Sequence, residues 1–483
     1  MKQTKKTKKP AVKSFTGLFK DSAVKWYDWV ILFALMLFCF LSFNMRDLPH
    51  TSGCSFAYLN GHFASFYEAL AEFGIDEHGE PGLFAAYFPT LYVIFAVWNI
   101  PMRVFGVVKG MTSQLNIVAL MWAKLLPCLF YFACGFLVFR LCLELKMHER
   151  KAKLVMFAFL SMPVAFIGQF VLGNYESILL FFCLMGILAW FKKKDLWFVF
   201  WFSLAFTCKY TAILLFFPLL LLRQKNIWKL ILMLAGVFVV AGLEFLIYRG
   251  SPAFRANVFG VGTTQEVETV TGYIFHSVVN IGFTWDNKEI PVYLTVVSFA
   301  FTAAYAYFKH CKDETEEGRY AMYILCLAVA CFFCLSKWHP QWLLLGIPFW
   351  TITAALHKDT HIFFFLDLVL GVLFVMFMVQ HFQGICDQVM LQQGVWKYLM
   401  QNRAVNPNIH MSMLIGKLDM ALEITMITAI LAVYSVFKHP KYMPEDAALS
   451  IDKTMIWLRI RTLLPLLFFI LPAMYCMIKS ISW

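Results

Sequence analysis

Long apolar runs recur along the whole chain, and they constrain its fold more than any other feature. Three of them read WVILFALMLFCFLSF, LVMFAFLSMPVAFIGQFVL and LILMLAGVFVVAGLEFLIY. Each approaches the roughly 20 apolar residues that an α-helix needs to cross about 30 Å of hydrocarbon. Because the bilayer core has no water to satisfy backbone N–H and C=O groups, such runs are expected to form helices. The sequence therefore predicts an all-α polytopic membrane protein.

Charge and cysteine usage narrow the function classes. Of the 483 residues 61% are hydrophobic and 14% charged, and the formal net charge is +12. The Lys and Arg residues form short clusters between apolar runs, which positive-inside topology explains without nucleic acid as a partner. Most of the 13 Cys lie singly inside apolar runs. We therefore predict neither a metal site nor another cofactor.

The topology depends on one apolar stretch, AAYFPTLYVIFAVWNIPMRVFG. If this stretch crossed the membrane, the basic clusters at 146–153, 192–194 and 223–229 would all lie outside. If it does not cross, they all lie in the cytoplasm, as the positive-inside bias requires. We therefore predict that residues 87–105 form a helix at the outer surface, broken by Pro89 and Pro101.

This choice predicts a bundle of about 13 transmembrane helices, with outer juxtamembrane helices in the first loop. The spans are expected at about 29–43, 116–142, 154–171, 177–191, 195–207, 211–222, 229–248, 291–308, 320–336, 342–356, 361–380, 414–436 and 460–480. Two of them, 195–207 and 211–222, are too short for upright spans. We expect them to form a hairpin of half-length helices that meets at Cys208-Lys209-Tyr210, where it lines a polar cavity.

Three regions follow from this topology. Residues 1–28 form a basic cytoplasmic tail, 29–358 a catalytic transmembrane module with an outer loop at 44–114, and 359–483 the C-terminal transmembrane helices. Polar residues collect in the outer loops, so chemistry is expected on the extracytoplasmic side. The short loops favour a bacterial plasma membrane over an endoplasmic reticulum.

Asp47 is the first candidate for chemistry. It follows the first span by about one turn, which puts its carboxylate at headgroup depth and suits a general base for a bilayer-embedded donor. The alternative is an interfacial residue that pairs with the adjacent Arg46.

Lys209 and Glu176 are the next candidates. An ammonium near the membrane centre needs a counter-ion, and an anionic ligand would supply one at Lys209. The alternative is a structural pair with a carboxylate such as Glu176, which stands at the outer start of a span in GNYES.

The segment SKWHPQW places Lys337, His339 and Gln341 at the outer end of a span. His339 precedes Pro340 at a helix boundary and could donate to a phosphate or a sugar hydroxyl, although a lone His is as often structural. For the flanking Trp342 we expect an ordinary place in an interfacial aromatic belt.

Five short elements follow one another between about residues 44 and 342. They are a carboxylate after the first span (Asp47), Tyr-x-Pro-x-Leu-Tyr (Tyr87, Pro89, Leu91, Tyr92), Gly-x-Tyr-acid-Ser (Gly173, Tyr175, Glu176, Ser177), a Lys-containing hairpin that ends in Pro (Lys209, Pro218), and a late His element (His339, Pro340, Gln341). In this order they resemble the GT-C superfamily of membrane glycosyltransferases, in particular the bacterial relatives of the second mannosyltransferase of GPI-anchor assembly. The chain departs from that pattern at Cys54, where an Asp often follows Ser-Gly, and at Glu176, where Asp is common.

The resemblance implies an inverting transfer of mannose or another hexose from a polyprenyl-phosphate sugar to a glycolipid or cell-envelope glycan. Asp47 would be the base, and Lys209 with Lys337 or His339 would neutralise the lipid phosphate. Glu176 and Gln341 would complete the donor site, and Tyr87 and Tyr92 would line a groove for the prenyl chain. No nucleotide-sugar domain is expected.

Two other classes fit a similar bundle. A lipid-linked saccharide flippase would need polar residues reachable from both faces, yet few charges lie well inside the spans (Lys124, Glu244, Asp367, Glu423). An oligosaccharide polymerase would be expected to carry a larger outer loop late in the chain. The sequence favours the transferase.

Overall fold

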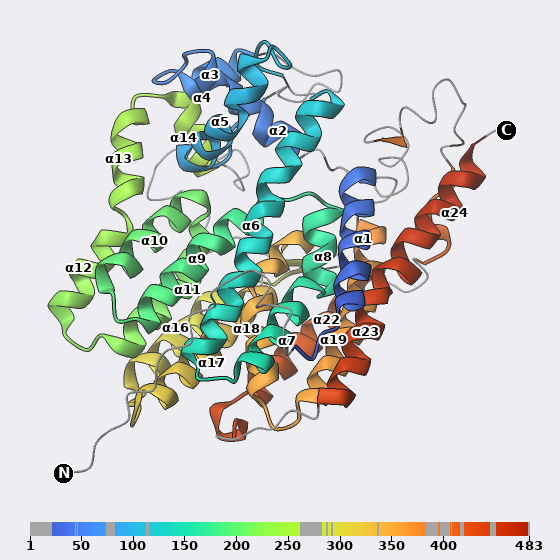
Figure 1. Ribbon diagram of the computed structural model, residues 1–483. Helices are drawn as coiled ribbons and strands as arrows, with labels where there is room; N and C mark the ends of the chain where they lie inside the picture. The colour runs from blue at the N-terminus through green and yellow to red at the C-terminus, as the bar shows by residue number, and fades with distance from the viewer. Residues whose placement is uncertain are drawn as a thin grey trace.

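The computed structural model is a bundle of helices with a small group of helices at one end (Figure 1). It describes residues 22–43, 45, 47–73, 83–112, 115–260, 283–285, 288–290, 293–335, 338–381, 395–396, 406, 408–415, 420–444 and 451–481. Within these residues two short strands, β1 (Phe283–Trp285) and β2 (Lys288–Ile290), form an antiparallel pair, and nearly all other regular structure is helical.

The helices of the first half are α1 (Trp26–Ser42), α2 (Asp47–Cys54), α3 (Phe56–Leu59), α4 (Phe66–Ala71), α5 (Pro89–Val104), α6 (Ile117–Glu144), α7 (Glu149–Leu160), α8 (Pro163–Phe170), α9 (Glu176–Phe191), α10 (Asp195–Cys208), η2 (Tyr210–Ala212), α11 (Ile213–Arg223), α12 (Ile227–Val237) and α13 (Val239–Tyr248). Those that follow are α14 (Pro252–Gly260), α16 (Tyr293–Phe308), α17 (Glu314–Phe333), η3 (Pro340–Leu345), α18 (Ile347–Leu356), α19 (Thr360–His381), η4 (Met411–Met413), α22 (Met420–Phe437), η5 (Pro440–Tyr442), α23 (Ile451–Pro465), η6 (Leu466–Ile470) and α24 (Leu471–Ser480).

The predicted spans fall on these helices, but the count of 13 crossings is not confirmed. Three helices are long and apolar enough to cross a membrane by themselves: α6, α19 and the continuous stretch Thr454–Ser480. The number rises to six if each of three bent pairs is one span. Two of those pairs divide predicted spans, with bends of 52° between α7 and α8 and 42° between α12 and α13. Pro163 begins α8, and a proline at that position cannot continue the preceding helix.

An outer layer of short helices, α2 to α5 with α14, covers one end of the bundle (Figure 1). Its core is aromatic, with Phe66, Tyr67 and Phe254 fully buried. A buried amide joins α2 and α5, because Asn99 Nδ2 donates to Ser52 Oγ at 2.8 Å and to Ser55 Oγ at 3.0 Å. The outer layer is therefore a packed unit rather than a set of loops.

Helix α5 corrects one part of the prediction. The segment is helical and is not among the candidate spans, but it is not broken by its prolines. Pro89 occupies the first position, where its missing N–H has no helical partner to lose, and Pro101 lies in the last turn. Trp98 and Trp122 fasten α5 to α6: each indole N–H donates to the other residue's carbonyl at 2.8 Å, and the rings stack at 4.6 Å.

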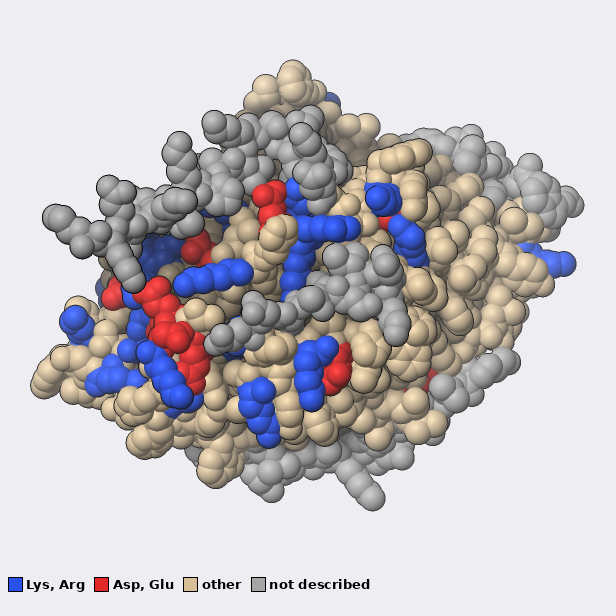
Figure 2. Space-filling view, turned by 60° about the horizontal axis from the view of Figure 1, so that its bottom comes forward, with Lys and Arg blue, Asp and Glu red and all other residues tan. Residues whose placement is uncertain are grey.

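Basic side chains gather at the opposite end of the bundle, which Figure 2 turns toward the viewer. Three of them converge on the acidic first turn of α17 from the C-terminal ends of α9, α11 and α16. Lys193 lies 2.5 Å from Glu314, Arg223 3.1 Å from Glu317, and Lys309 3.0 Å from Glu316. Carboxylates are favourable at a helix N-terminus, so this turn is a natural anchor for the basic loops. The clusters predicted to be cytoplasmic therefore share one face.

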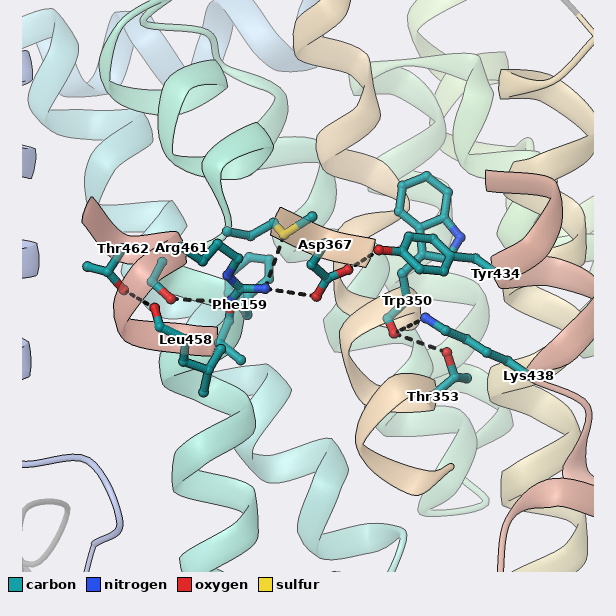
Figure 3. A network of polar contacts seen from close by, with 12 residues as sticks. Phe159, Trp350, Thr353, Asp367, Tyr434, Lys438, Leu458, Arg461 and Thr462 are labelled. Atoms are coloured by element: carbon teal, nitrogen blue, oxygen red, sulfur yellow. Dashed lines mark hydrogen bonds and ion pairs between the residues drawn. The ribbon is translucent and has the colours of Figure 1, made fainter. Parts of the chain in front are cut away.

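Buried charges tie the C-terminal helices to the rest of the bundle (Figure 3). Arg461 on α23 is fully buried and donates to Asp367 Oδ2 on α19 at 2.8 Å, while Tyr434 on α22 donates to the other carboxylate oxygen. The same guanidinium donates to Ala158 O at 2.5 Å and to Ser161 Oγ at 3.2 Å. Because Ala158 lies in the last turn of α7, Arg461 satisfies backbone at the α7–α8 bend.

The position of α5 outside the bundle generates a labelling prediction. An impermeant thiol reagent applied from outside should modify a Gly110→Cys variant and leave a Lys192→Cys variant unmodified, because the two sites lie at opposite ends of the molecule. Labelling after permeabilisation controls for a hidden thiol. Modification of Lys192→Cys in intact cells would overturn the assignment of α5 as a surface helix.

The Arg461 network generates a stability prediction. Arg461→Met leaves Asp367 buried beside the α7 terminus without its cation, so the free energy of unfolding should fall by about 3–5 kcal/mol. The measurement is thermal unfolding in detergent. The double variant Arg461→Met/Asp367→Leu should recover much of the loss, and equal losses in the single and double variants would contradict a charge-pairing role.

Candidate functional site

The turn between α8 and α9 delivers the first site carboxylate. Gly173 has φ of 63°, a left-handed conformation that glycine adopts without strain. The next residue, Asn174, is buried, and its side-chain oxygen accepts a hydrogen bond from the backbone N–H of Glu176 at 3.2 Å. The Gly-Asn pair thus reverses the chain, and Asn174 satisfies the first backbone N–H of α9, which fixes Glu176 in its first turn.

The break after α10 delivers the ammonium. Helix α10 ends at Cys208, Lys209 is extended with φ of −164° and ψ of 128°, and η2 leads into α11. The predicted hairpin of half-length helices is present. The side chains of Lys209 and Glu176 are only 6% and 5% exposed, and Lys209 Nζ lies 2.5 Å from Glu176 Oε1. The sequence left two partners open for Lys209, an anionic ligand and a carboxylate such as Glu176. The structure shows the pair with Glu176.

Aromatic rings surround this pair. Lys209 Nζ lies 3.9 Å from the centroid of the Trp342 ring and 6.0 Å from that of Tyr87. Cation–π attraction is strongest where water is excluded, so both rings stabilise the buried ammonium. Trp342 was expected to lie in an interfacial aromatic belt, which stays a prediction. Its ring also lies over the Lys209 ammonium, a contact that the sequence did not suggest.

The late His element lies on the outer side of the same ring. His339 is exposed, directly precedes η3, and its imidazole centroid is 5.0 Å from Trp342 and 6.0 Å from His381 at the end of α19. Gln341 is buried, and a Cβ at Gly168 would lie 3.7 Å from its Cα, so η3 packs directly on α8. The Gln341 side-chain oxygen accepts no hydrogen bond from the residues that the structure describes. Lys337, the remaining candidate in this segment, lies outside the described residues.

Asp47 comes close to the same turn from the outer layer. It begins α2, which departs from α1 at 69°. The next residue, Leu48, packs on the α8–α9 turn, since a Cβ at Gly173 would lie 3.8 Å from Leu48 Cδ2. Burial raises the pKa of the Tyr175 phenol, and the nearby Tyr87, Tyr92 and Asp47 add to the effect. The Tyr175 ring in turn lies 6.0 Å from Tyr87.

The two tyrosines assigned to a lipid groove have different surroundings. Tyr87 contacts Tyr175 and faces Lys209, whereas Tyr92 is 2% exposed and packs on Phe66 in the core of the outer layer. A groove for a prenyl chain at these positions stays a prediction.

Sequence reasoning missed three residues that the structure brings to the site: Trp342, Tyr175 and Lys124. Trp342 and Tyr175 lie in SKWHPQW and GNYES, two segments that the sequence had already indicated through neighbouring residues. Lys124 was noted only as a charge within a span, because nothing local in the sequence identifies its partners.

Metal ligands do not gather in this part of the molecule. Among the described residues, no group of three or more His, Cys, Asp or Glu side chains is arranged to hold a metal ion. Among the described residues, the charged side chains around this turn are those of Asp47, Lys124, Glu176 and Lys209, with the imidazole of His339 on the other side of Trp342.

The apolar helices and the family comparison together define an integral membrane glycosyltransferase. Residues 87–337, slightly more than half of the chain, match Glycosyltransferase family 87, and the chain belongs to that family. The matched range includes Tyr87, Glu176 and Lys209, while Asp47 precedes it and His339 follows it. No curated protein matches the chain. The expected membrane glycosyltransferase class is thereby confirmed, whereas the narrower likeness to the second GPI-anchor mannosyltransferase stays a prediction.

The buried pair generates a stability prediction. Lys209→Met leaves Glu176 buried without its cation, so the free energy of unfolding should fall by about 3–5 kcal/mol. The measurement is thermal unfolding in detergent without added lipid donor. Adding Glu176→Gln should restore most of the stability.

An exposed pair provides the matched control. Lys193 and Glu314 lie at the same 2.5 Å separation but are 59% and 68% exposed, so Lys193→Met should leave the unfolding transition nearly unchanged. A Lys209→Met protein as stable as the parent would show that the pair is not a structural element of the bundle.

Proposed function

We propose that this protein transfers a hexose, with mannose the first candidate, from a polyprenyl-phosphate donor to an acceptor on the extracytoplasmic side of the membrane. The acceptor class is a glycolipid or a cell-envelope glycan, and the membrane is a bacterial plasma membrane. The observation that carries this proposal is the buried Lys209–Glu176 pair, because it lies beside the turn that Leu48 and Tyr175 connect to Asp47.

The location of these groups supports a lipid-linked donor. The ammonium is buried between half-length helices, yet Trp342 connects it to the exposed His339. A donor whose prenyl chain lies in the bilayer and whose phosphate lies at headgroup depth suits such a path, which runs from the protein interior to the outer surface. The basic face lies at the other end of the bundle (Figure 2), as expected for a site on the extracytoplasmic side.

The reaction that we propose is a single inverting displacement. Asp47 accepts the proton of the acceptor hydroxyl as its oxygen forms a bond to the anomeric carbon. The bond between that carbon and the phosphate oxygen breaks, and the electron pair leaves with the lipid phosphate. Stabilising charge at the leaving group is usually the largest catalytic contribution, and Lys209 and His339 are the groups that would supply it.

Glu176 would keep Lys209 charged before the donor binds. An ammonium has three N–H donors, and Glu176 is the only described side chain that accepts a hydrogen bond from it. The carboxylate would keep the lysine protonated in the absence of substrate, since an unpaired charge is expensive to bury. An arriving phosphate would then share the ammonium with Glu176. Because the ammonium is already removed from water, donor binding would not have to desolvate it.

Asp47→Asn tests the proposed base. The variant keeps the size of the side chain and removes its basicity, so turnover of a polyprenyl-phosphate hexose should fall by about 10²–10⁴-fold. The measurement is release of polyprenyl phosphate by the purified protein in lipid vesicles, with mannosyl and glucosyl donors compared.

Glu72→Gln is the matched control, because Glu72 is an exposed carboxylate of the same outer layer and should not affect turnover. Near-normal release by Asp47→Asn would move the base to Glu176 or to Glu68, a half-buried carboxylate of α4 in the outer layer. Translocation of an intact donor without release of polyprenyl phosphate would instead support a flippase.

A further inference from the structure

Lys124 is a buried ammonium that the proposed reaction does not use. It lies on α6, is 1% exposed, and donates to the carbonyl oxygens of Phe40 and Phe43. Its ammonium also lies 5.0 Å from the Phe40 ring. Among the described residues no carboxylate lies within ion-pair distance of it. The positive charge is therefore compensated chiefly by backbone.

The two carbonyls belong to the C-terminus of α1. The last carbonyls of an α-helix have no partner within the helix, and together they carry partial negative charge. The backbone N–H of Phe43 satisfies Cys39 O, and Lys124 takes Phe40 O and Phe43 O. The ammonium is thus a cap supplied by another helix, placed where α1 ends and α2 departs at 69°.

The stem of the same lysine lies beside the other side of the site. A Cβ built at Gly173 would lie 4.0 Å from Lys124 Cε and 3.8 Å from Leu48 Cδ2. The lysine stem, the α2 residue next to Asp47, and the turn that leads to Glu176 are therefore close neighbours.

We propose that Lys124 is a positioning residue that sets Asp47 relative to the Lys209–Glu176 pair. Its ammonium holds the end of α1, which precedes Asp47, and its stem lies against the α8–α9 turn, which precedes Glu176. One side chain therefore fixes the positions of both carboxylates. A helix that ends near a membrane surface can have its carbonyls hydrated, so the cap alone does not require a buried lysine. The position of the lysine stem beside Gly173 connects this cap to the turn that carries Glu176.

The first test does not need a substrate. In an Asp47→Cys background, the rate of modification by an impermeant maleimide is measured at residue 47 by peptide mass spectrometry on the full-length protein in vesicles. Adding Lys124→Met removes the cap, so the α1–α2 corner should open more often and the rate should rise about 5- to 30-fold. An unchanged rate overturns the proposal.

Lys438→Met is the matched control. Lys438 is also fully buried, donates to a backbone carbonyl (Trp350 O, 2.6 Å) and lies over an aromatic ring (Tyr434, 3.9 Å), but it belongs to the C-terminal network (Figure 3). It should leave the labelling rate at residue 47 unchanged, and an equal rise in both variants would show general loosening instead of positioning. If Lys124→Met does not fold, Lys124→Gln, which keeps two N–H donors without the reach, serves for the same comparison.

The second test rests on the proposed function. With Asp47 intact, Lys124→Met should lower kcat for release of polyprenyl phosphate and leave the donor KM near that of the parent, because Met keeps an unbranched apolar stem beside the α8–α9 turn and Lys209 and Glu176 are unchanged. A raised KM with normal kcat contradicts the positioning role. A fully active Asp47→Asn protein would refute the assignment of the base, while the labelling result would still decide whether Lys124 holds the corner.

Discussion

The buried ion pair of Lys209 and Glu176 is the interaction on which the arrangement of the site depends. Removing two charges from water costs desolvation free energy, and their mutual attraction offsets this cost only if the partners are held in good geometry. Here the Gly173-Asn174 turn fixes Glu176 at the start of α9, and the break between α10 and α11 fixes Lys209. Trp342 then covers the ammonium from η3, so three elements distant in sequence meet at one pair.

The same physical device recurs at the ends of other helices. Besides Lys124 at α1, Arg461 donates to Ala158 O in the last turn of α7, Arg223 to Trp190 O near the end of α9, and Lys225 to Tyr307 O at the end of α16. In each case a cation from a neighbouring helix or connection meets the negative end of a helix dipole. A bundle with broken and bent helices exposes many such carbonyls, and basic side chains satisfy them where water is excluded.

The sequence predicted this bundle where its signals were local. The half-length helices followed from the short apolar segments 195–207 and 211–222 and from Lys209 between them, and GNYES placed Glu176 at the start of a span. The partner of Lys209 stayed open because a contact between positions 176 and 209 leaves no mark in either segment. The contact of Trp342 with Lys209 was not predicted, since ring orientation depends on how η3 packs, and Pro101 does not break α5 because it lies in the final turn. The 13 crossings were inferred from apolar runs and the positive-inside bias, which do not distinguish a span from a bent or shortened helix.

The central claim is that the buried pair and Asp47 form the site where a polyprenyl-phosphate sugar reacts. The most direct measurement is a cryo-EM structure of the protein with such a donor bound in lipid nanodiscs. We expect the phosphate within about 3 Å of Lys209 Nζ, beside the ring of Trp342, with the sugar between the phosphate and Asp47. Density for the phosphate on the basic face, or a headgroup on the outer side that leaves Lys209 bonded to Glu176 alone, would contradict the account.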